Sequence, residues 1–333
     1  MDSITHIVLG MVEGELIAGK KLGKKAMLFG AIANSLPDID VIPSLFATIE
    51  NSLLMHRGFT HSILFAILFS IVAAFYFRRK NSALDFSGWL MLWGCGMFSH
   101  ILIDSFTTYG TGWFEPFSHY RVSFNTIFVA DPFFTISLLI GGIALLIKKK
   151  YSNGRTAWAL IGLIPALIYL CYTFYNKQKV DTVTQQNFKS QELTVDRYMT
   201  TPSPLNNFLW YILAENKDGF YSGYYSVFDK NDSIRFSFTP MNSELANQYL
   251  NDAKVQKLIR FSQGYYCFTT DSSGAVSWHD LRFGMTDLFS DKKDFVFSYD
   301  LKNNNDGMVV QRGRMKSISS DAFKKLIERI KGI

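Results

Sequence analysis

The sequence predicts an α-helical membrane domain with several spans, followed by a small α+β domain. Apolar residues make up 48% of the 333-residue chain and are concentrated in its first half. Asp and Glu are scarce between positions 62 and 175, and aromatic strand-like runs separated by polar turns begin after Asn176. We therefore predict a boundary at 176/177, with a membrane domain over 1–176 and an α+β domain over 177–333.

Four apolar runs are expected to cross the membrane, at 62–77, 88–103, 132–147 and 156–175. A spanning helix needs about 20 residues, so flanking aromatic residues have to complete the three shorter runs. The runs could instead be buried helices of a soluble protein, but four of them with basic flanks are rare in soluble domains. Two shorter helices, 4–18 and 26–36, are broken by glycine and polar residues and are expected to be half-spanning or re-entrant.

Basic residues cluster in three of the connecting loops. If the segments alternate in direction, these clusters share one face of the membrane, which the positive-inside rule assigns to the cytoplasm. The opposite loops carry only Arg57 and Arg121 before the second domain, which is therefore expected on the extracytoplasmic side. The clusters are Lys20, Lys21, Lys24 and Lys25; Arg78, Arg79 and Lys80; and Lys148, Lys149, Lys150 and Arg155.

Composition also excludes some classes of protein. The formal charge of +6 does not indicate nucleic-acid binding, because the basic residues flank apolar runs and form no extended patch. The three cysteines have no metal-type spacing and support neither a disulfide framework nor a zinc ribbon. We expect no signal peptide, since the start of the chain is not basic and His6, Glu13 and Glu15 interrupt its apolar run.

The same alternation of helices gathers polar residues at their extracytoplasmic ends. Imidazole and carboxylate groups together bind divalent metals, and a centre with few protein ligands leaves a position for water. Five of the six histidines belong to this set, which predicts a metal site near the outer edge of the bundle. Its members are His6, Asp38, Asp40, His56, His61, His100, Asp104, His119 and Asp131.

Spacing refines this prediction for individual residues. His100 and Asp104 are four residues apart, so both side chains face one side of a helix and can reach one ion. His56 and His61 are five apart and would diverge on one helix, so we place His56 in the preceding loop. Arg57 suits an anionic group such as phosphate, because its guanidinium is planar and donates in a fork.

Each residue also has an interpretation without metal. A histidine at the mouth of a helix can be an interfacial polar residue, and His119 is expected on the surface. Asp38 and Asp40 can be turn and capping residues, while His100 and Asp104 can form a structural pair. Convergence on one face favours the metal site, but a short loop can present either Asp38 or Asp40 as the ligand.

Four segments carry a family resemblance: MDSITHIVLG, SLPDID, HRGFTHS and HILIDSFTTYGT. In this order they resemble the motifs of the YdjM-like membrane-bound metal-dependent hydrolases, also described as LexA-binding, inner-membrane-associated hydrolases, over about residues 1–147. The resemblance implies an inner-membrane location and, through a distant grouping with zinc-dependent phospholipases C and zinc nucleases, phosphoester hydrolysis. It implies a metal and catalytic set of His6, Asp38, Asp40, His56, His61, His100 and Asp104.

Residues and resemblance together predict a metal-dependent hydrolase that acts on an ester or phosphoester, with a lipid as a candidate substrate. Zinc is favoured over manganese and magnesium because several imidazoles are available. A water activated by the metal would attack, a free Asp or His would act as general base, and Arg57 would stabilise developing negative charge. We assign His6, Asp38, His56, His61, His100 and Asp104 to the metal, and Asp40, Arg57 and Asp104 to catalysis.

The alternative is a membrane protein that binds metal without hydrolysis. A transporter would carry polar residues through the bilayer, and the runs 62–77 and 132–147 contain almost none. A regulatory scaffold with a protein partner would lose stability on metal removal and would turn over no ester.

The second domain is expected to form an antiparallel sheet with two amphipathic helices, 243–261 and 319–330. Asp280 and Arg282 alternate with His279 on one strand, so we expect them to form an ion pair on the surface. The strand-like runs are 208–215, 220–228, 234–240, 264–270, 275–284 and 295–301.

Overall fold

The computed structural model describes the 333-residue chain except residues 273, 286–294, 302–308, 311–319 and 333. The described residues divide into two compact units, and a helical N-terminal region precedes antiparallel sheets with helices, which confirms the predicted fold class. The first unit comprises Met1–Ile42, Met55–Tyr175 and Pro204–Asn207, and the second comprises Pro43–Leu54, Asn176–Ser203 and Phe208–Ile333.

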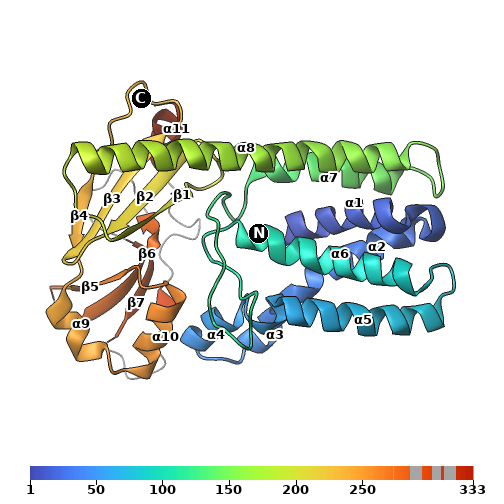
Figure 1. Ribbon diagram of the computed structural model, residues 1–333, viewed down its shortest axis with the longest axis horizontal. Coiled ribbons are helices and arrows are strands. Elements are labelled where there is room, and N and C mark those ends of the chain that lie inside the picture. The colour runs from blue at the N-terminus through green and yellow to red at the C-terminus, as the bar shows by residue number, and fades with distance from the viewer. Residues whose placement is uncertain (273, 286–294, 302–308, 311–319, 333) are drawn as a thin grey trace. The chain divides into compact units, whose positions relative to one another are not determined.

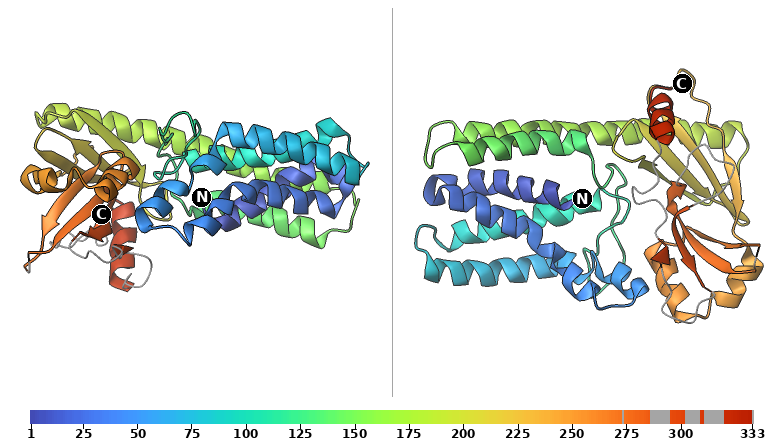
Figure 2. Two further views of the ribbon diagram at one scale, coloured as in Figure 1. Left: turned by 90° about the horizontal axis from the view of Figure 1, so that it is seen from below. Right: turned by 180° about the vertical axis from the view of Figure 1, so that it is seen from behind.

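The first unit is a bundle of helices that run along a common direction (Figures 1 and 2). Short helical turns lie between its second and third long helices. The long helices are α1 (Ser3–Leu22), α2 (Lys24–Ser35), α5 (Ile63–Lys80), α6 (Phe86–Ser105), α7 (Pro132–Ile147) and the first part of α8 (Arg155–Ser190). The turns between α2 and α5 are η1 (Leu36–Asp40), α3 (Val41–Ser44), α4 (Ile49–Met55) and η2 (Phe59–His61), and Pro43–Leu54 among them is assigned to the second unit.

Capping residues explain where these helices begin. Ser62 accepts a hydrogen bond from the backbone N–H of Phe65 at the start of α5, and Asp85 accepts one from Gly88 at the start of α6. Asp131 caps α7 in the same way, with Pro132 in the first turn, where a missing N–H is harmless. The expected run 132–147 therefore coincides with α7.

Length and hydropathy limit which helices can cross a membrane. Within the described residues, α6 and α8 are long and apolar enough to span. The segment Ile49–His61 and α5 pass the test together, but they are bent by 53° at their junction. The 16 residues of α7 reach only about 24 Å, which is shorter than the hydrocarbon core of a bilayer. Of the four spans expected from the sequence, two are therefore long enough among the described residues, or three if Ile49–His61 and α5 together form one bent span.

The helices of the bundle pack through several apolar clusters, two of which lie around α1 and α6. Trp89 and Trp93 of α6 contact Phe29 of α2 and Phe77 of α5 through edge-on and stacked rings. A second cluster joins α1 to α7 and α8 through Val8, Leu9, Phe134, Leu138 and Ala166. Together these contacts fix α1 and α2 against α6, which is the arrangement that positions the candidate site.

The second unit contains two antiparallel sheets in its described part, with strand orders β1-β2-β3-β4 and β5-β6-β7-β8 (Figure 1). One face of the first sheet packs on α8 through Trp210, Ile212 and Val180, and its other face meets the second sheet through Leu213 and Leu281. The strands are β1 (Arg197–Pro202), β2 (Leu209–Glu215), β3 (Gly219–Ser226), β4 (Ser237–Pro240), β5 (Tyr266–Thr270), β6 (Val276–Met285), β7 (Phe295–Asp300) and β8 (Val309–Val310).

Both helices expected in this unit are present, and the first of them is divided in two. The expected helix 243–261 is split into α9 (Ser243–Tyr249) and α10 (Ala253–Phe261), because Asp252 caps a new helix by accepting from Lys254 N–H. The expected helix 319–330 corresponds to α11 (Ser320–Ile330), and position 319 lies outside the described residues.

The expected surface location of the Asp280–Arg282 ion pair is wrong. Both side chains are buried on β6, which lies between β5 and β7. The Arg282 guanidinium donates two hydrogen bonds to the Asp280 carboxylate, at 3.0 Å from Nε and 2.7 Å from Nη2. It also lies over the Phe261 ring, so its charge is compensated by the carboxylate and one face of its plane is covered by the ring.

Candidate metal centre

Three separate chain segments supply the polar side chains of the candidate site. Pro37 follows α2 and cannot continue its hydrogen-bond ladder, so the chain turns into η1 and presents Asp38 and Asp40. The turn η2 ends at His61, immediately before the cap of α5. The last turns of α6 carry His100 and Asp104 on one face, as their spacing predicts.

Close helix packing brings these segments together. A Cβ atom at Gly10 of α1 would lie 2.3 Å from the carbonyl oxygen of Gly30 in α2, so neither residue has room for a side chain. A Cβ at Gly96 of α6 would meet Ala33 Cβ at 2.7 Å and Asn34 N at 3.1 Å. The backbone of α2 therefore lies directly against both α1 and α6, next to His100.

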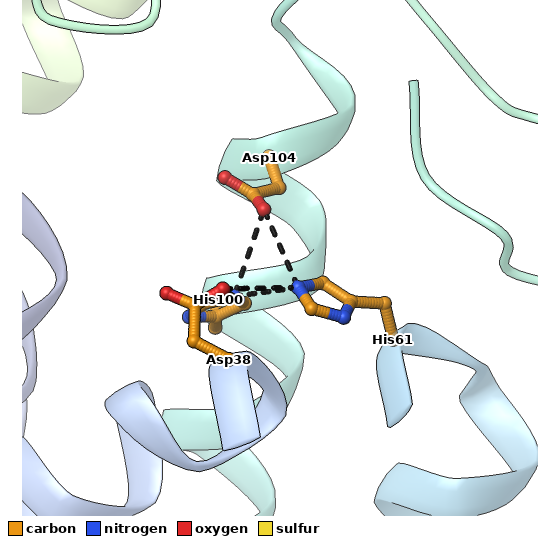
Figure 3. A group of neighbouring side chains, drawn as sticks. All are labelled: Asp38, His61, His100 and Asp104. Carbon is orange, nitrogen blue, oxygen red and sulfur yellow. Dashed lines mark hydrogen bonds and ion pairs between the residues drawn. The ribbon is translucent and has the colours of Figure 1, made fainter. Parts of the chain in front are cut away.

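Four side chains converge on one point, as Figure 3 shows. His61 Nε2 lies 3.5 Å from Asp38 Oδ1 and 3.5 Å from Asp104 Oδ2. His100 Nε2 lies 3.6 Å from each of the same two oxygens. The two Nε2 atoms are 3.0 Å apart. His61, His100 and Asp104 are fully buried, while Asp38 retains 24% side-chain exposure and opens the site to one side.

These distances fit a single tetrahedral ion. Zinc with ligands at about 2.0–2.2 Å holds neighbouring ligand atoms roughly 3.3–3.6 Å apart, and four of the separations above are 3.5–3.6 Å. The two nitrogens at 3.0 Å are slightly closer than that range. The donor set of two imidazoles and two carboxylates suits a borderline divalent metal.

Hydrogen bonds behind the imidazoles support the same conclusion. His100 Nδ1–H donates to the backbone oxygen of Asn34. His61 Nδ1 lies 3.3 Å from Asp40 Oδ2 and 3.2 Å from Thr60 Oγ1, which itself donates to Asp40. With both Nδ1 atoms acting as donors, the two Nε2 atoms face each other and two carboxylate oxygens, so either a proton or a metal ion lies between the two nitrogens. A group of this composition could hold a divalent metal ion.

Asp40 lies behind His61 and outside this group of four. Its Oδ1 atom lies 3.0 Å from His56 Nδ1, and its Oδ2 atom accepts from Arg57 N–H at 2.9 Å. Burial would raise the pKa of Asp40, but the imidazoles of His56 and His61 outweigh burial and hold this pKa well below its usual range. Asp40 is therefore an ionised acceptor that orients its neighbours.

Asp38 is the aspartate that faces the other ligand atoms. Burial opposes its ionisation, but the imidazoles of His100 and His61 hold the pKa of Asp38 well below its usual range. Asp38 also belongs to a second group with Asp40 and His56, whose ligand atoms lie within 4.8 Å of one another. Within the described part of the chain, these are the two groups of His, Cys, Asp or Glu side chains that could hold an ion.

Arg57 contributes positive charge beside the group of four. Its Nε atom lies 3.0 Å from Asp104 Oδ2, and its Nη1 atom donates to Thr107 Oγ1 at 2.5 Å. The side chain is buried and lies over the Tyr109 ring. The backbone of Arg57 has φ +60°, a left-handed conformation held by Asp40 on its N–H and by Gly112 N–H on its carbonyl.

His6, which was expected to bind metal, lies behind Asp104. Its Nε2 atom is 3.2 Å from Asp104 Oδ1, which is the oxygen turned away from the other two histidines. The ring stacks on His100 with centroids 3.7 Å apart. His6 is in neither group of ligand atoms found among the described residues.

Two further members of the predicted polar set lie elsewhere. His119 is exposed and pairs with Glu115, as expected of a surface residue. Asp131 caps α7 and accepts a hydrogen bond from the Tyr169 hydroxyl at 2.9 Å. Neither belongs to the two groups found in the described residues.

The sequence analysis missed the polar residues that surround the imidazoles. Asn34 and Ser99 are single polar residues inside apolar runs, and Glu13 was considered only as a polar residue that interrupts the first apolar run. Glu13 Oε2 accepts from Ser99 Oγ at 2.7 Å, and Asn34 Nδ2 donates to the same Ser99 oxygen at 2.7 Å. The available signal was the spacing of Glu13, seven residues after His6 on the same helical face.

Comparison with known proteins places this chain among bacterial membrane proteins. The family model of the YdjM inner membrane protein matches residues 1–180, which is more than half of the chain. The inner membrane protein YbcI of Escherichia coli is 35% identical over 120 residues, covering 35% of this chain and 69% of that protein.

Two Bacillus subtilis proteins, both described as uncharacterized, are also similar. YfhP is 30% identical over 181 residues, which cover 50% of this chain and about half of YfhP (52%). YvsG is 29% identical over 123 residues, which cover 35% of this chain and 71% of YvsG. No solved structure matches the chain.

Proposed function

Because the chain belongs to the family of the YdjM inner membrane protein, we propose that it is a multi-pass membrane hydrolase that uses a divalent metal ion to cleave an ester or phosphoester. The observation that carries this proposal is the convergence of two imidazole nitrogens and two carboxylate oxygens at 3.0–3.6 Å. Asp38, His61, His100 and Asp104 are the proposed ligands, and zinc is the favoured metal over manganese and magnesium.

The remaining residues would prepare the site for hydrolysis. A bound divalent ion supplies a Lewis acid that lowers the pKa of a coordinated water and polarises the ester. Arg57 pairs with Asp104 and would stabilise negative charge that develops on the substrate. Asp40 was first assigned a catalytic role, and we now propose that it acts by orienting His61 and His56.

His56 is the proposed proton acceptor. Its side chain is 38% exposed, so it can reach a substrate, whereas His61 and His100 are enclosed. Asp40 Oδ1 accepts from its Nδ1–H at 3.0 Å, which leaves Nε2 free to take a proton from the attacking water. This arrangement gives His56 a catalytic role in place of the metal-binding role first predicted for it.

A lipid-linked ester is the favoured substrate class. Exposed apolar side chains lie beside the ligands in sequence: Ile39 separates the two aspartates of η1, Val41 follows them, and Phe59 precedes His61 by two residues. An acyl chain would pack on such side chains while its ester or phosphoester reaches the metal ligands.

The site is proposed to lie at the extracytoplasmic end of the bundle, with residues 177–333 forming a separate domain on that side. Site residues and basic clusters lie at opposite ends of the helices. His6 lies near the start of α1 and Lys20 in its last turn, while His61 precedes α5 and Arg78 lies in its last turn. The positive-inside rule assigns the basic ends to the cytoplasm.

A turnover assay tests the proposed activity. Detergent-purified protein loaded with zinc would be incubated with bis(p-nitrophenyl) phosphate and with phospholipid in mixed micelles. We expect turnover that is lost in Asp38→Ala and His61→Ala and retained in His119→Ala, whose histidine is exposed outside the site. Zinc-dependent thermal stabilisation without turnover of either substrate would overturn the proposed hydrolase activity. It would instead support the alternative of a regulatory scaffold that binds metal without hydrolysis.

A further inference from the structure

Glu13 is an ionisable residue inside the helix bundle to which the proposed hydrolysis gives no role. It lies two turns from His6 on the same face of α1. Its Oε2 atom accepts hydrogen bonds from Ser99 Oγ at 2.7 Å and from Asn34 Nδ2 at 3.4 Å. A carboxylate in a membrane bundle is costly to desolvate, so a residue with these partners is a candidate for function.

Glu13 is the acceptor at one end of a short chain of hydrogen bonds. The Ser99 hydroxyl donates to Glu13 Oε2 at 2.7 Å, which is shorter than its 3.1 Å contact with the backbone oxygen of Gly96. The Ser99 oxygen then accepts from Asn34 Nδ2 at 2.7 Å. The Asn34 amide is thereby turned so that its Oδ1 atom faces His6 Nδ1 at 3.0 Å.

This chain of hydrogen bonds ends at the imidazole rings of His6 and His100. With Asn34 Oδ1 as acceptor, His6 donates from Nδ1, and on the other side of the ring Asp104 Oδ1 lies 3.2 Å from Nε2 as a second acceptor. The His6 ring stacks on His100, and the backbone oxygen of Asn34 accepts from His100 Nδ1–H. Asn34 thus contacts both imidazoles, and its amide orientation is set from Glu13.

We propose that Glu13 is a positioning residue of the metal centre. Acting through Ser99 and Asn34, it holds a proton on His6 Nδ1 and supports the orientation of Asp104 and His100. The inference rests on one part of the proposed function, namely that the centre binds a metal ion. The hydrogen-bond chain itself does not depend on an ion.

Glu15 offers a matched control on the same helix. It is a buried carboxylate two residues further on, but it pairs with Arg155, at 2.8 Å from Nε and 2.6 Å from Nη2. Residues two apart on a helix face different directions. A substitution at Glu15 therefore removes a buried carboxylate from α1 without touching Ser99 or Asn34.

The first test measures zinc affinity. In Glu13→Gln the new amide can donate to Ser99, so the Ser99 hydroxyl is released toward Asn34 Oδ1 or the Gly96 carbonyl and no longer holds the Asn34 amide in one orientation. We expect the zinc dissociation constant to rise about tenfold, with altered Co²⁺ absorption, and Ser99→Ala to change both in the same sense. Glu15→Gln, or Arg155→Lys if that variant does not fold, is expected to keep the wild-type dissociation constant. Wild-type affinity in both Glu13→Gln and Ser99→Ala would overturn the inference.

The second test needs no metal and separates this inference from the proposed function. Nitrogen NMR of ¹⁵N-histidine protein, with the His6 signal assigned from His6→Asn, reports which ring nitrogen carries the proton. We expect a protonated Nδ1 in the wild type and loss of that signal in Glu13→Gln, or in Ser99→Ala if Glu13→Gln does not fold. An unprotonated Nδ1 in the wild type, or unchanged signals in the variants, would contradict the positioning role even if the protein binds zinc. If the wild type binds no zinc, the proposed function fails and this measurement still decides the inference.

Discussion

The Nε2 atoms of His61 and His100 lie 3.0 Å apart, and the Nδ1 atom of each ring faces an oxygen acceptor on its far side. Two ring nitrogens at this separation share either a proton, as in a hydrogen bond, or a metal ion. Asp38 and Asp104 add two carboxylate oxygens to the same point, so the group has the ligands and the charge expected of a metal centre.

The hydrogen bond behind His61 leads to a first prediction. Asp40→Asn replaces an acceptor-only carboxylate by an amide that can turn its NH₂ group toward His61 Nδ1, which disfavours the metal-binding tautomer. We expect metal affinity to fall about 10- to 100-fold, measured by competition with a chromophoric chelator. Asp85→Asn is the control, because Asp85 caps the opposite end of α6 and asparagine also caps well. Equal affinity in the two variants would contradict the role of Asp40.

Packing of α6 against α2 gives a second prediction. In Gly96→Ala the new methyl group would lie 2.7 Å from Ala33 Cβ, so the helices have to move apart next to Asn34. We expect a loss of about 1–3 kcal/mol of stability together with weaker metal binding. Gly94→Ala, whose Cβ would meet only Ser70 Oγ at 3.9 Å, should be neutral or stabilising by up to about 1 kcal/mol. Thermal unfolding in detergent compares the two, and equal midpoints would argue against the tight crossing.

The Glu15–Arg155 ion pair is predicted to stabilise the bundle without affecting the metal. Glu15→Gln leaves the buried Arg155 without its carboxylate partner and should cost about 3–5 kcal/mol. Arg155 also donates to the backbone oxygen of Leu145, so the effect should be loosening of α7 and α8 against α1. The expected result is a lower unfolding temperature with unchanged zinc affinity, and an unchanged unfolding temperature would contradict it.

The proposed topology predicts which side of the membrane the second domain occupies. In a variant without native cysteines, Lys230→Cys should react with a membrane-impermeant maleimide in intact spheroplasts, because position 230 is exposed in that domain. Lys150→Cys, in the basic link between α7 and α8, should react only after lysis. The opposite pattern would place the second domain in the cytoplasm.

Local patterns in the sequence predicted the fold class and the bounds of α7, because apolar runs and capping residues act within one helix. The spacing of His100 and Asp104 likewise predicted that they share a face. The choice between Asp38 and Asp40 could not be made in this way, because it depends on how η1 turns after Pro37.

Patterns along a single helix could not predict the contacts between helices. Asn34 and Ser99 interrupt apolar runs, and their importance follows from the approach of α2 to α1 and α6 at Gly30 and Gly96. The burial of Asp280 and Arg282 also depends on distant partners, since Phe261 of α10 covers the guanidinium. A pattern along one strand indicates that the two residues can pair, but it does not indicate what packs on them.

Metal content is the most direct test of the central claim, that Asp38, His61, His100 and Asp104 bind a divalent ion. Elemental analysis would compare detergent-purified wild type with Asp38→Ala, His61→Ala and the exposed control His119→Ala. We predict close to one zinc per chain in the wild type and in His119→Ala, and little in the other two variants. Negligible metal in all four proteins, also after reloading with zinc, manganese or magnesium, would contradict a metal centre at this site.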